Sequence, residues 1–377
     1  MNRVLLDKAI VEVSEFKTKG VNEYHLMVHV TDPTLAFQQQ VDVLLAAYDE
    51  ALAGLPGAVA VFKRYFLSDA TNQMDLLLGM TTEGSSCALS IVQQAPLDGT
   101  KIALWAYLLT DVQTRVLSNG LFEALHGSYR HIWTGSNNNR AANSEYQMRL
   151  LLNDYSMNLM EQGCKLADNC IRTWIFVQNI DNNYAGVVKA RNEVFVTQGL
   201  NSETHFIAST GIGGRMANPK TLVQFDAYAV AGIQREQIHY LYGRSHLNPT
   251  YEYGVSFERG TYVDYGDRRQ VFISGTASIN NHGEIMYPGD VRQQTLRVWE
   301  NVETLLKEAD CTYEEVEQMV VYLRDIADYA VVKALYDERF PDKPKVFVNA
   351  PVCRPGWLVE MECMGVKVLE NKVFPVL

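Results

Sequence analysis

The chain has 377 residues, of which 47% are hydrophobic and 20% charged, so it can bury a substantial core and hold two or three domains. Its formal net charge of −11 and the absence of a Lys/Arg-rich block argue against a nucleic-acid partner, because binding to phosphates requires a basic surface. No apolar run approaches the about 18 residues of a membrane span, and Asp7 and Lys8 stand where a signal peptide would be apolar, so we expect a cytoplasmic protein without membrane association.

Hydrophobic periodicity predicts a similar succession of elements in each third of the chain. In the first third we expect a helix at 34–53, a strand at 59–67, a short helix at 72–78 and strands at 88–94 and 101–109. In the middle third we expect a helix at 144–162, a strand at 170–180, a helix at 183–195 and strands at 205–210 and 222–230. In the last third we expect a strand at 271–278, a helix at 291–309, a strand at 316–325, a helix at 328–340 and a final strand ending near 363.

The second helices of the last two thirds also share sequence. Positions 183–195 and 328–340 both contain Tyr-Ala followed by Val-Val-Lys-Ala, with one inserted glycine. We therefore predict three related units, at 1–115, 116–245 and 246–377. The order of elements favours an α+β sandwich in each unit, with two helices on one face of the sheet. Three such units in one chain suggest a monomeric pseudo-trimer that needs no further copies to close its symmetry, and a higher oligomer is left open.

The final strand carries two carboxylates on one face, because a period of two places Glu360 and Glu362 on the same side. The alternative interpretation is an ordinary amphipathic strand, in which both carboxylates are exposed to solvent and have no functional role. The corresponding positions of the middle and first units hold, in order, Gln224, Asp226, Ala103 and Trp105. Only the last unit keeps both carboxylates, which favours one functional pocket and two that have lost their function.

The last unit resembles the YjgF/RidA superfamily. The segments that carry the resemblance are Phe272 to Ser278, Gly289-Asp290-Val291 with Gln293 or Gln294, Asn301, Val321 to Asp325, and Leu358 to Glu362. The resemblance implies tandem RidA/chorismate-mutase-like sandwiches, each a mixed sheet with two helices on one face. It also implies pockets for small molecules in the clefts between neighbouring units, with the first two units as diverged copies of the third.

In imine-deaminating members of this superfamily, a glutamate positions the attacking water and an arginine holds the substrate carboxylate. The resemblance puts the glutamate at Glu360 and the arginine at Lys345, which keeps the charge but loses the bidentate fork. The small loop that contains a tyrosine in those proteins falls near Phe257-Glu258-Arg259, which has none. Both departures put 2-imino acid deaminase activity in doubt.

The long, fused chorismatases of the same superfamily are similar in further respects. They share a Ser-Gly-Thr-Ala-Ser strand, a Cys-Arg turn before Leu-Val-Glu, and an arginine close to Arg259. This resemblance implies Glu360 and Cys353 as catalytic residues and a small carboxylate as substrate. We expect partial burial and the like charge of Glu362 to raise the pKa of Glu360, so that it can act as a general acid.

Several residues are expected around the substrate, each with a plainer alternative. Cys353 either shapes the pocket, attacks an intermediate if Arg354 favours its thiolate, or is an inert filler. Arg259, Lys345 and Arg354 are candidate carboxylate ligands, although Arg354 can equally be a solvated turn residue and Arg259 a partner in a surface salt bridge. The remaining candidates for substrate binding are Gly275, Glu362 and Arg215. Arg215 follows a glycine-rich stretch that serves either as a tight turn or as a contribution to the pocket from the neighbouring unit.

Metals and cofactors are not expected. The six cysteines form no Cys-x-x-Cys pair, the eight histidines form no His-Glu-x-x-His arrangement, and the glycine-rich stretch matches no nucleotide-binding loop. Three functions remain open at this stage: a chorismatase-like hydrolase, an imine or enamine deaminase of the Rid type, and a non-catalytic protein that binds small carboxylates.

Overall fold

The structure is a computed structural model that describes residues 2–81 and 86–377, and it contains three mixed six-stranded sheets. The first sheet has the strand order β1-β2-β3-β6-β4-β5 and consists of β1 (Asn2–Leu6), β2 (Ala9–Phe16), β3 (Glu23–Val30), β4 (Val59–Leu67), β5 (Ala88–Gln93) and β6 (Ile102–Leu109). Its helices are α1 (Phe37–Ala53) and α2 (Ala70–Met80).

The other two sheets repeat this order. The middle unit consists of β7 (Gln113–Val116), β8 (Phe122–His126), β9 (Tyr129–Asn138), β10 (Cys170–Val177), β11 (Ala208–Gly213) and β12 (Val223–Ala231), with α3 (Ser144–Glu161), α4 (Leu166–Asn169) and α5 (Ile180–Thr197). The third unit consists of β13 (Ile238–Leu241), β14 (Gly260–Asp264), β15 (Arg268–Ala277), β16 (Val316–Leu323), β17 (Lys345–Asn349) and β18 (Val359–Val368), with α6 (Val291–Glu308) and α7 (Tyr329–Arg339). The chain passes between sheets at 110–112 and 232–237, slightly before the expected boundaries near 115 and 245.

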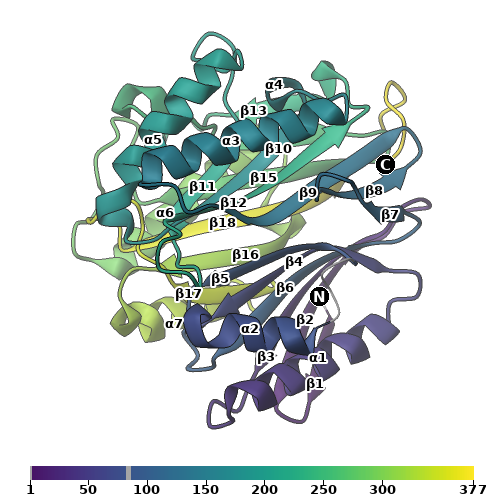
Figure 1. Cartoon of the computed structure of the whole chain (residues 1–377), viewed down its shortest axis with the longest axis vertical. Coiled ribbons are helices and arrows are strands. Elements are labelled where there is room, and N and C mark those ends of the chain that lie inside the picture. Colours follow the sequence, from purple (N-terminus) through teal and green to yellow (C-terminus); the bar gives the residue numbers. More distant parts are fainter. Residues whose placement is uncertain (1, 82–85) are drawn as a thin grey trace.

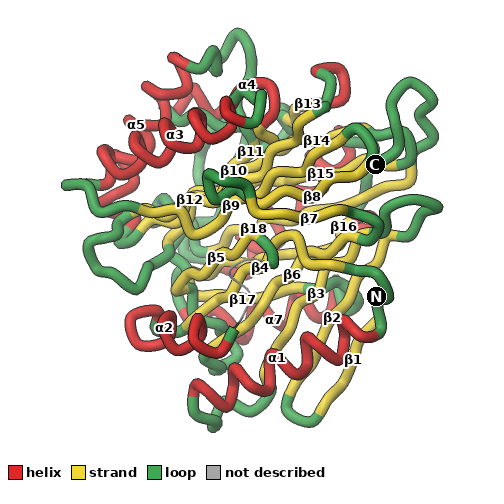
Figure 2. The backbone as a smooth tube through the Cα atoms, turned by 45° about the vertical axis from the view of Figure 1, so that its right-hand side comes forward, coloured by secondary structure: helices red, strands yellow, loops and turns green. Residues whose placement is uncertain are grey.

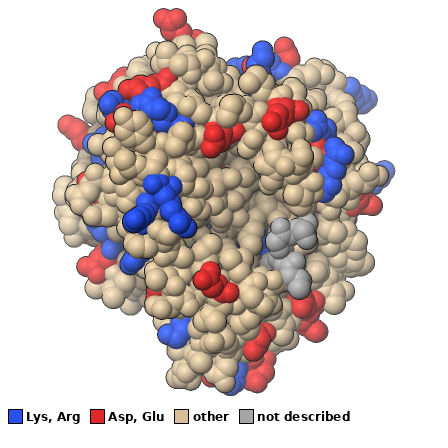
Figure 3. Space-filling model, viewed as in Figure 1, with Lys and Arg blue, Asp and Glu red and all other residues tan. Residues whose placement is uncertain are grey.

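The three sheets face one another and their helices lie outside (Figures 1 and 2). In Figure 1 the helices α1 and α2 lie at the lower end of the molecule and α3 and α5 at its upper end. The predicted α+β fold of three tandem units is therefore confirmed. None of the helices in the described part of the chain is long and apolar enough to cross a membrane. On the face seen in Figure 3, acidic and basic side chains are interspersed.

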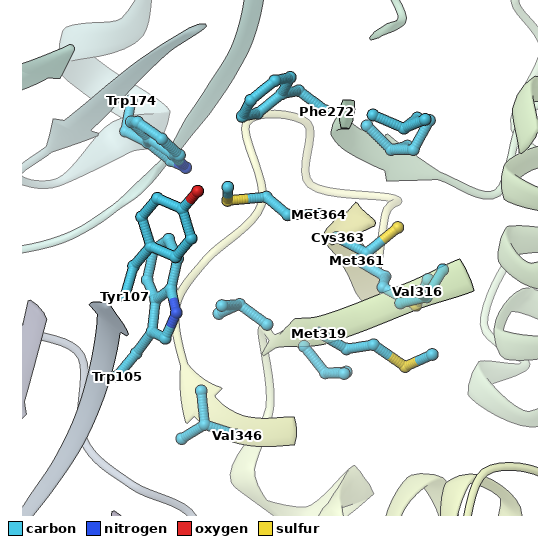
Figure 4. Packing of buried hydrophobic residues seen from close by; sticks show 14 of the residues in the cluster. Trp105, Tyr107, Trp174, Phe272, Val316, Met319, Val346, Met361, Cys363 and Met364 are labelled. Carbon is cyan, nitrogen blue, oxygen red and sulfur yellow. The ribbon is translucent and has the colours of Figure 1, made fainter. Parts of the chain in front are cut away.

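A hydrophobic core fills the space between the sheets and holds side chains from all three units. Trp105 of β6 and Trp174 of β10 approach with ring centroids 6.3 Å apart, and both rings lie near Met364 of β18 (Figure 4). Two further cores lie between the sheets and helices of the first and middle units. Burial at this density fixes the units against one another, so residues on facing sheets have defined neighbours.

Candidate active site

Glu360 lies on β18, whose neighbours in the sheet are β15 and β16. It pairs with Ala277 on one side and Tyr322 on the other, and its side chain projects toward the middle unit. The carboxyl group packs directly on backbone, because a Cβ added to Gly275 would lie 2.1 Å from Glu360 Oε1. A register shift between Ile273 and Thr276 marks a bulge at this point of β15. Only glycine leaves room for the carboxyl group here.

The surroundings of Glu360 favour its neutral form. The residue is 4% exposed, and burial raises the pKa of its carboxyl group from the ordinary value to about 8. This value includes the negative charge of Glu362, which also raises the pKa, and the positive charges of Arg172 and Arg259, which lower it without offsetting the burial. Glu360 is thus protonated at neutral pH. The two causes that we expected to raise the pKa of Glu360, its burial and the like charge of Glu362, are both present.

The middle unit supplies the opposite wall of the pocket through α5 and β11. Tyr184 and Arg191 stand two turns apart on α5, so they lie on one face of the helix. Ser209 and Gly211 of β11 complete this wall. Arg191 is 1% exposed, yet its Nε and Nη2 have no hydrogen-bond partner among the described residues. Unpaired donors on a buried cation mark a place for an anion.

Arginines and aromatic rings alternate along one side of the pocket. The guanidinium of Arg191 lies 5.8 Å from the ring centroid of Phe257, and that of Arg259 lies 5.4 Å from the same ring. Arg259 also lies 5.5 Å from the ring of Tyr253, which Arg354 approaches to 5.0 Å. The rings hold the guanidinium planes in place, and stacking of this kind leaves the N–H groups at the guanidinium edge able to form hydrogen bonds.

Arg259 is anchored in the loop that precedes β14. Its Nη2 donates to the backbone oxygen of Asn248 at 2.9 Å and to the side-chain oxygen of Asn248 at 3.2 Å. Its Nε has no partner among the described residues, and the residue is 5% exposed. Arg259 is therefore a buried pocket residue, which excludes the alternative of a surface salt bridge.

Cys353 lies at the rim of the pocket beside Arg354. Burial and, to a smaller extent, the charge of Glu360 raise the pKa of its thiol to about 12, although Arg354 lowers it. The alternative in which Arg354 favours a thiolate is therefore not supported, because Arg354 does not offset the burial. Cys353 remains a group that shapes the pocket. The sequence-predicted residues that line this pocket together are Glu360, Cys353, Arg259, Arg354 and Gly275.

Lys345 lies elsewhere, in a cleft between the first and third units. Its strand, β17, is the edge of the third sheet and faces the first unit, whereas the edge strand facing Glu360 is β11 of the middle unit. The strand register identifies the residue of the middle unit that is equivalent to Lys345. Met319 of β16 pairs with Lys345, and Thr173 of β10, which is the counterpart of Met319, pairs with Ser209. Ser209, and not Lys345, occupies this position in the pocket.

Glu362 shares the face of Glu360 but lies inside the central core. Its carboxylate accepts hydrogen bonds from Arg172 Nη2 at 2.9 Å and from Trp174 Nε1 at 2.8 Å, and Arg64 Nη1 lies 3.8 Å away. It acts on Glu360 through charge and is not a lining residue. Arg215 does not line the pocket either. It lies at the contact between the middle and first units, where its backbone pairs with that of Gln93.

The residues missed from the sequence are those of the neighbouring unit, chiefly Arg191, Tyr184 and Ser209. One signal was available. Arg191 interrupts the apolar face of its helix, where Val187 and Val194 are buried. Because pockets were expected in the clefts between units, an arginine on an otherwise apolar helix face indicates a residue that lines such a pocket. Among the described residues, no group of three or more His, Cys, Asp or Glu side chains could hold a metal ion.

Comparison with known proteins agrees with this architecture. A family model described as Endoribonuclease L-PSP matches residues 257–367. A RutC family protein of Pyrococcus abyssi (strain GE5 / Orsay) is 32% identical over 99 residues, which are 26% of this chain and 78% of that protein. A crystal structure of a chorismatase superposes with a TM-score of 0.65 at 17% identity, covering 81% of this chain and 93% of that one. A putative endoribonuclease L-PSP from Entamoeba histolytica is 20% identical, with a TM-score of 0.30, and covers 34% of this chain and 99% of its own.

Fold and site together define a class: an α+β chain of three tandem units with a cationic pocket between two of them. The chain belongs to the Endoribonuclease L-PSP family, which is the RidA/YjgF superfamily, in a fused form that shares its fold with chorismatase. The predicted resemblance is thereby confirmed.

Proposed function

We propose that this protein is a chorismatase-like hydrolase that cleaves the enolpyruvyl ether of chorismate, with Glu360 as general acid. The observation that carries the proposal is a buried carboxyl group, with its pKa raised to about 8, in a pocket with two buried arginines that have unpaired donors. Chorismate suits this arrangement because it carries two carboxylates and an acid-sensitive enol ether. The shared fold with a chorismatase supports the same choice.

The reaction follows from the protonation state of Glu360. Its carboxyl proton is transferred to the terminal vinyl carbon, which leaves an oxocarbenium ion on the ether carbon and a carboxylate on Glu360. Water adds to that carbon and returns a proton to Glu360. The resulting hemiketal breaks at the ether bond, giving pyruvate and the ring alcohol. Arg191 and Arg259 would hold the two substrate carboxylates.

The deaminase alternative fits the pocket less well. A glutamate that positions and activates water does so best as a carboxylate, whereas burial keeps Glu360 neutral at neutral pH. The third alternative, binding without catalysis, makes the same use of the arginines but gives the raised pKa of Glu360 no role. A hydrolase uses both the arginines, which bind the substrate carboxylates, and the raised pKa of Glu360, which keeps a proton available for transfer.

The test is to incubate the protein with chorismate and measure the release of pyruvate. We expect Arg191→Ala to reduce kcat/KM by about 10- to 100-fold, because charge-assisted hydrogen bonds to the substrate are lost. Its urea unfolding midpoint should change little, since Nε and Nη2 of Arg191 have no hydrogen-bond partner to leave behind in the described part of the chain. The matched control is Arg115→Ala on β7, whose side chain is 65% exposed. No pyruvate from the wild-type protein would refute the proposal.

Gly275→Ala should also reduce turnover, by about 100-fold, because the new Cβ would occupy the place of Glu360 Oε1 and displace the acid by more than an ångström. Gly79→Ala in α2 is the control, since a Cβ there meets no atom within 4 Å. Steady-state pyruvate release compares the two. Equal rates for Gly275→Ala and the wild type would contradict the packing described for Glu360.

A further inference from the structure

The helix α3 of the middle unit is apolar on two opposite faces. It lies on the outside of the molecule beside α5 (Figures 1 and 2). Its inner face packs on the core between the sheet and the helices of that unit. Its outer face is turned to solvent and carries four large apolar side chains: Tyr146 is 54% exposed, Leu150 44%, Met157 54% and Met160 66%. Packing within the chain accounts for the inner face only.

The outer residues of α3 follow a heptad repeat. Tyr146, Leu150, Asn153, Met157 and Met160 are spaced by four, three, four and three residues, and Asn153 is exposed as well. This is the spacing of the a and d positions at the seam of a two-stranded coiled coil. These five residues, called the outer stripe below, run almost the full length of α3 on the side that faces away from its sheet.

The equivalent helices of the other two units do not have such a stripe. A buried glutamine aligns the three helices, because Gln40, Gln147 and Gln294 each accept a backbone N–H from the residue directly before β6, β12 and β18, at 2.8, 2.7 and 2.9 Å. In α6 the positions of the stripe are then occupied by Gln293, Arg297, Glu300, Thr304 and Lys307. Across α1 and α6, which are both fully described, no large apolar side chain is exposed to the extent seen in α3. The fold therefore does not require the outer stripe, and an exposed apolar patch of this kind marks a contact surface.

A second copy of the same helix matches the outer stripe. When two copies of α3 pack in parallel about a two-fold axis, each residue of the stripe meets the same residue of the second copy, as in an isologous interface. Asn153 lies at the centre of the stripe. Its side-chain amide is both a donor and an acceptor, so it can pair with the same amide across the axis. A wholly apolar partner surface would leave that amide buried without a hydrogen bond.

Charged residues beside the stripe determine the direction of the second helix. One flank carries the exposed acids Asp154 and Glu161. The flank toward α5 carries both signs of charge, since Arg149 forms ion pairs with Glu145 and Glu193. In an antiparallel pair the acidic flank would face its own copy, whereas in a parallel pair it faces the mixed flank. Contact between like charges disfavours the antiparallel arrangement.

The size of the stripe sets the expected strength of the contact. A standard protein–protein interface buries about 800 Å² on each partner, and one face of a single helix supplies only part of that area. The area therefore predicts reversible association with a Kd in the micromolar range, roughly 10–100 µM, and not a permanent dimer.

We propose that α3 is a self-association surface, through which two copies of this chain pair in parallel along the outer stripe. The surface includes none of the residues that line the pocket of Glu360. The inference therefore stands whether or not the chain hydrolyses chorismate.

Sedimentation velocity of the full chain, from about 1 to 200 µM, tests the association. We expect the weight-average mass to rise with concentration from that of one chain toward that of two. Leu150→Glu places two charges in the seam and should raise the Kd at least about tenfold, with an unchanged urea unfolding midpoint because the side chain is exposed. The matched control is Leu76→Glu in α2, where the apolar side chain is 41% exposed. A one-chain mass at every concentration overturns the proposal, as does a Leu150→Glu variant that associates as the wild type or the Leu76→Glu variant does.

Disulfide cross-linking tests the direction of the two helices. In the parallel pair, residue 146 lies beside residue 146 of the second copy, so Tyr146→Cys should form a linked dimer under mild oxidation, and Met160→Cys should do so as well. The wild type should remain unlinked, because five of its cysteines are buried and Cys353 is half-buried. Leu76→Cys controls for random collision. Linked dimers that form only when Tyr146→Cys and Met160→Cys are mixed, or that form in neither variant, overturn the proposal.

Discussion

Glu360→Gln is expected to lower turnover of chorismate by about 10²- to 10⁴-fold while leaving KM nearly unchanged. Glutamine has almost the same shape as protonated glutamic acid, so the packing on Gly275 is retained, but its amide has no acidic proton to donate. Because the arginines are untouched, substrate carboxylates should bind as before. Pyruvate release and KM under steady-state conditions measure both effects. Glu300→Gln on the exposed face of α6 is the control.

The pH dependence provides an independent check on the same residue. Turnover should fall as pH rises through about 8, where Glu360 loses the proton that it must donate. Stability follows the same group: its pKa is raised in the folded state, so its contribution is fully present below the unfolded pKa and is lost as pH rises through the folded pKa of about 8. Glu360→Gln should remove that loss. A wild-type rate that is constant from pH 6 to 9, or a Gln variant as active as the wild type, would contradict the assignment.

Much of the fold could be predicted because helix periodicity and the repeat survive in the sequence. The helices around 144–162, 291–309 and 328–340 lie close to α3, α6 and α7. Of the three strands that begin each unit, only β15 was predicted, as the strand at 271–278, and β3 shows why the others were missed. Seven of its eight residues are buried, since one face meets the central core and the other meets α1, so the alternation that marks a strand is lost.

The candidate site was likewise predictable only in part from the sequence. Glu360, Gly275, Cys353 and Arg354 could be found because they belong to segments of the same unit that resemble one family. Arg191 comes from the neighbouring unit, and the sequence does not state which unit faces which. The same ambiguity misplaced Lys345: it was assigned to the third unit, to which it belongs, but only the assembled structure shows that its edge of the sheet faces the first unit.

A buried charge network joins the three units beside the pocket, and it includes the second carboxylate of β18. Arg64 comes from the first unit, Arg172 from the middle unit and Glu362 from the third. Asp226 of the middle unit accepts a hydrogen bond from Arg64 Nη2 at 3.0 Å. All four side chains are at most 2% exposed, so each charge depends on the others for compensation.

Glu362→Gln is therefore expected to reduce the free energy of unfolding by about 3–5 kcal/mol, because it leaves Arg172 and Arg64 buried with Asp226 as the remaining carboxylate. Asp181→Asn is the matched control: Asp181 also joins two units through Arg324, at 2.8 Å, but its side chain is 43% exposed, so the loss should be about 1 kcal/mol or less. Urea unfolding compares the two variants. Activity supplies a second measurement, since removing the like charge lowers the pKa of Glu360 and should move the alkaline limb of the pH profile to lower pH. If Glu362→Gln were as stable as Asp181→Asn and kept the wild-type pH profile, the network would neither hold the units together nor act on the acid.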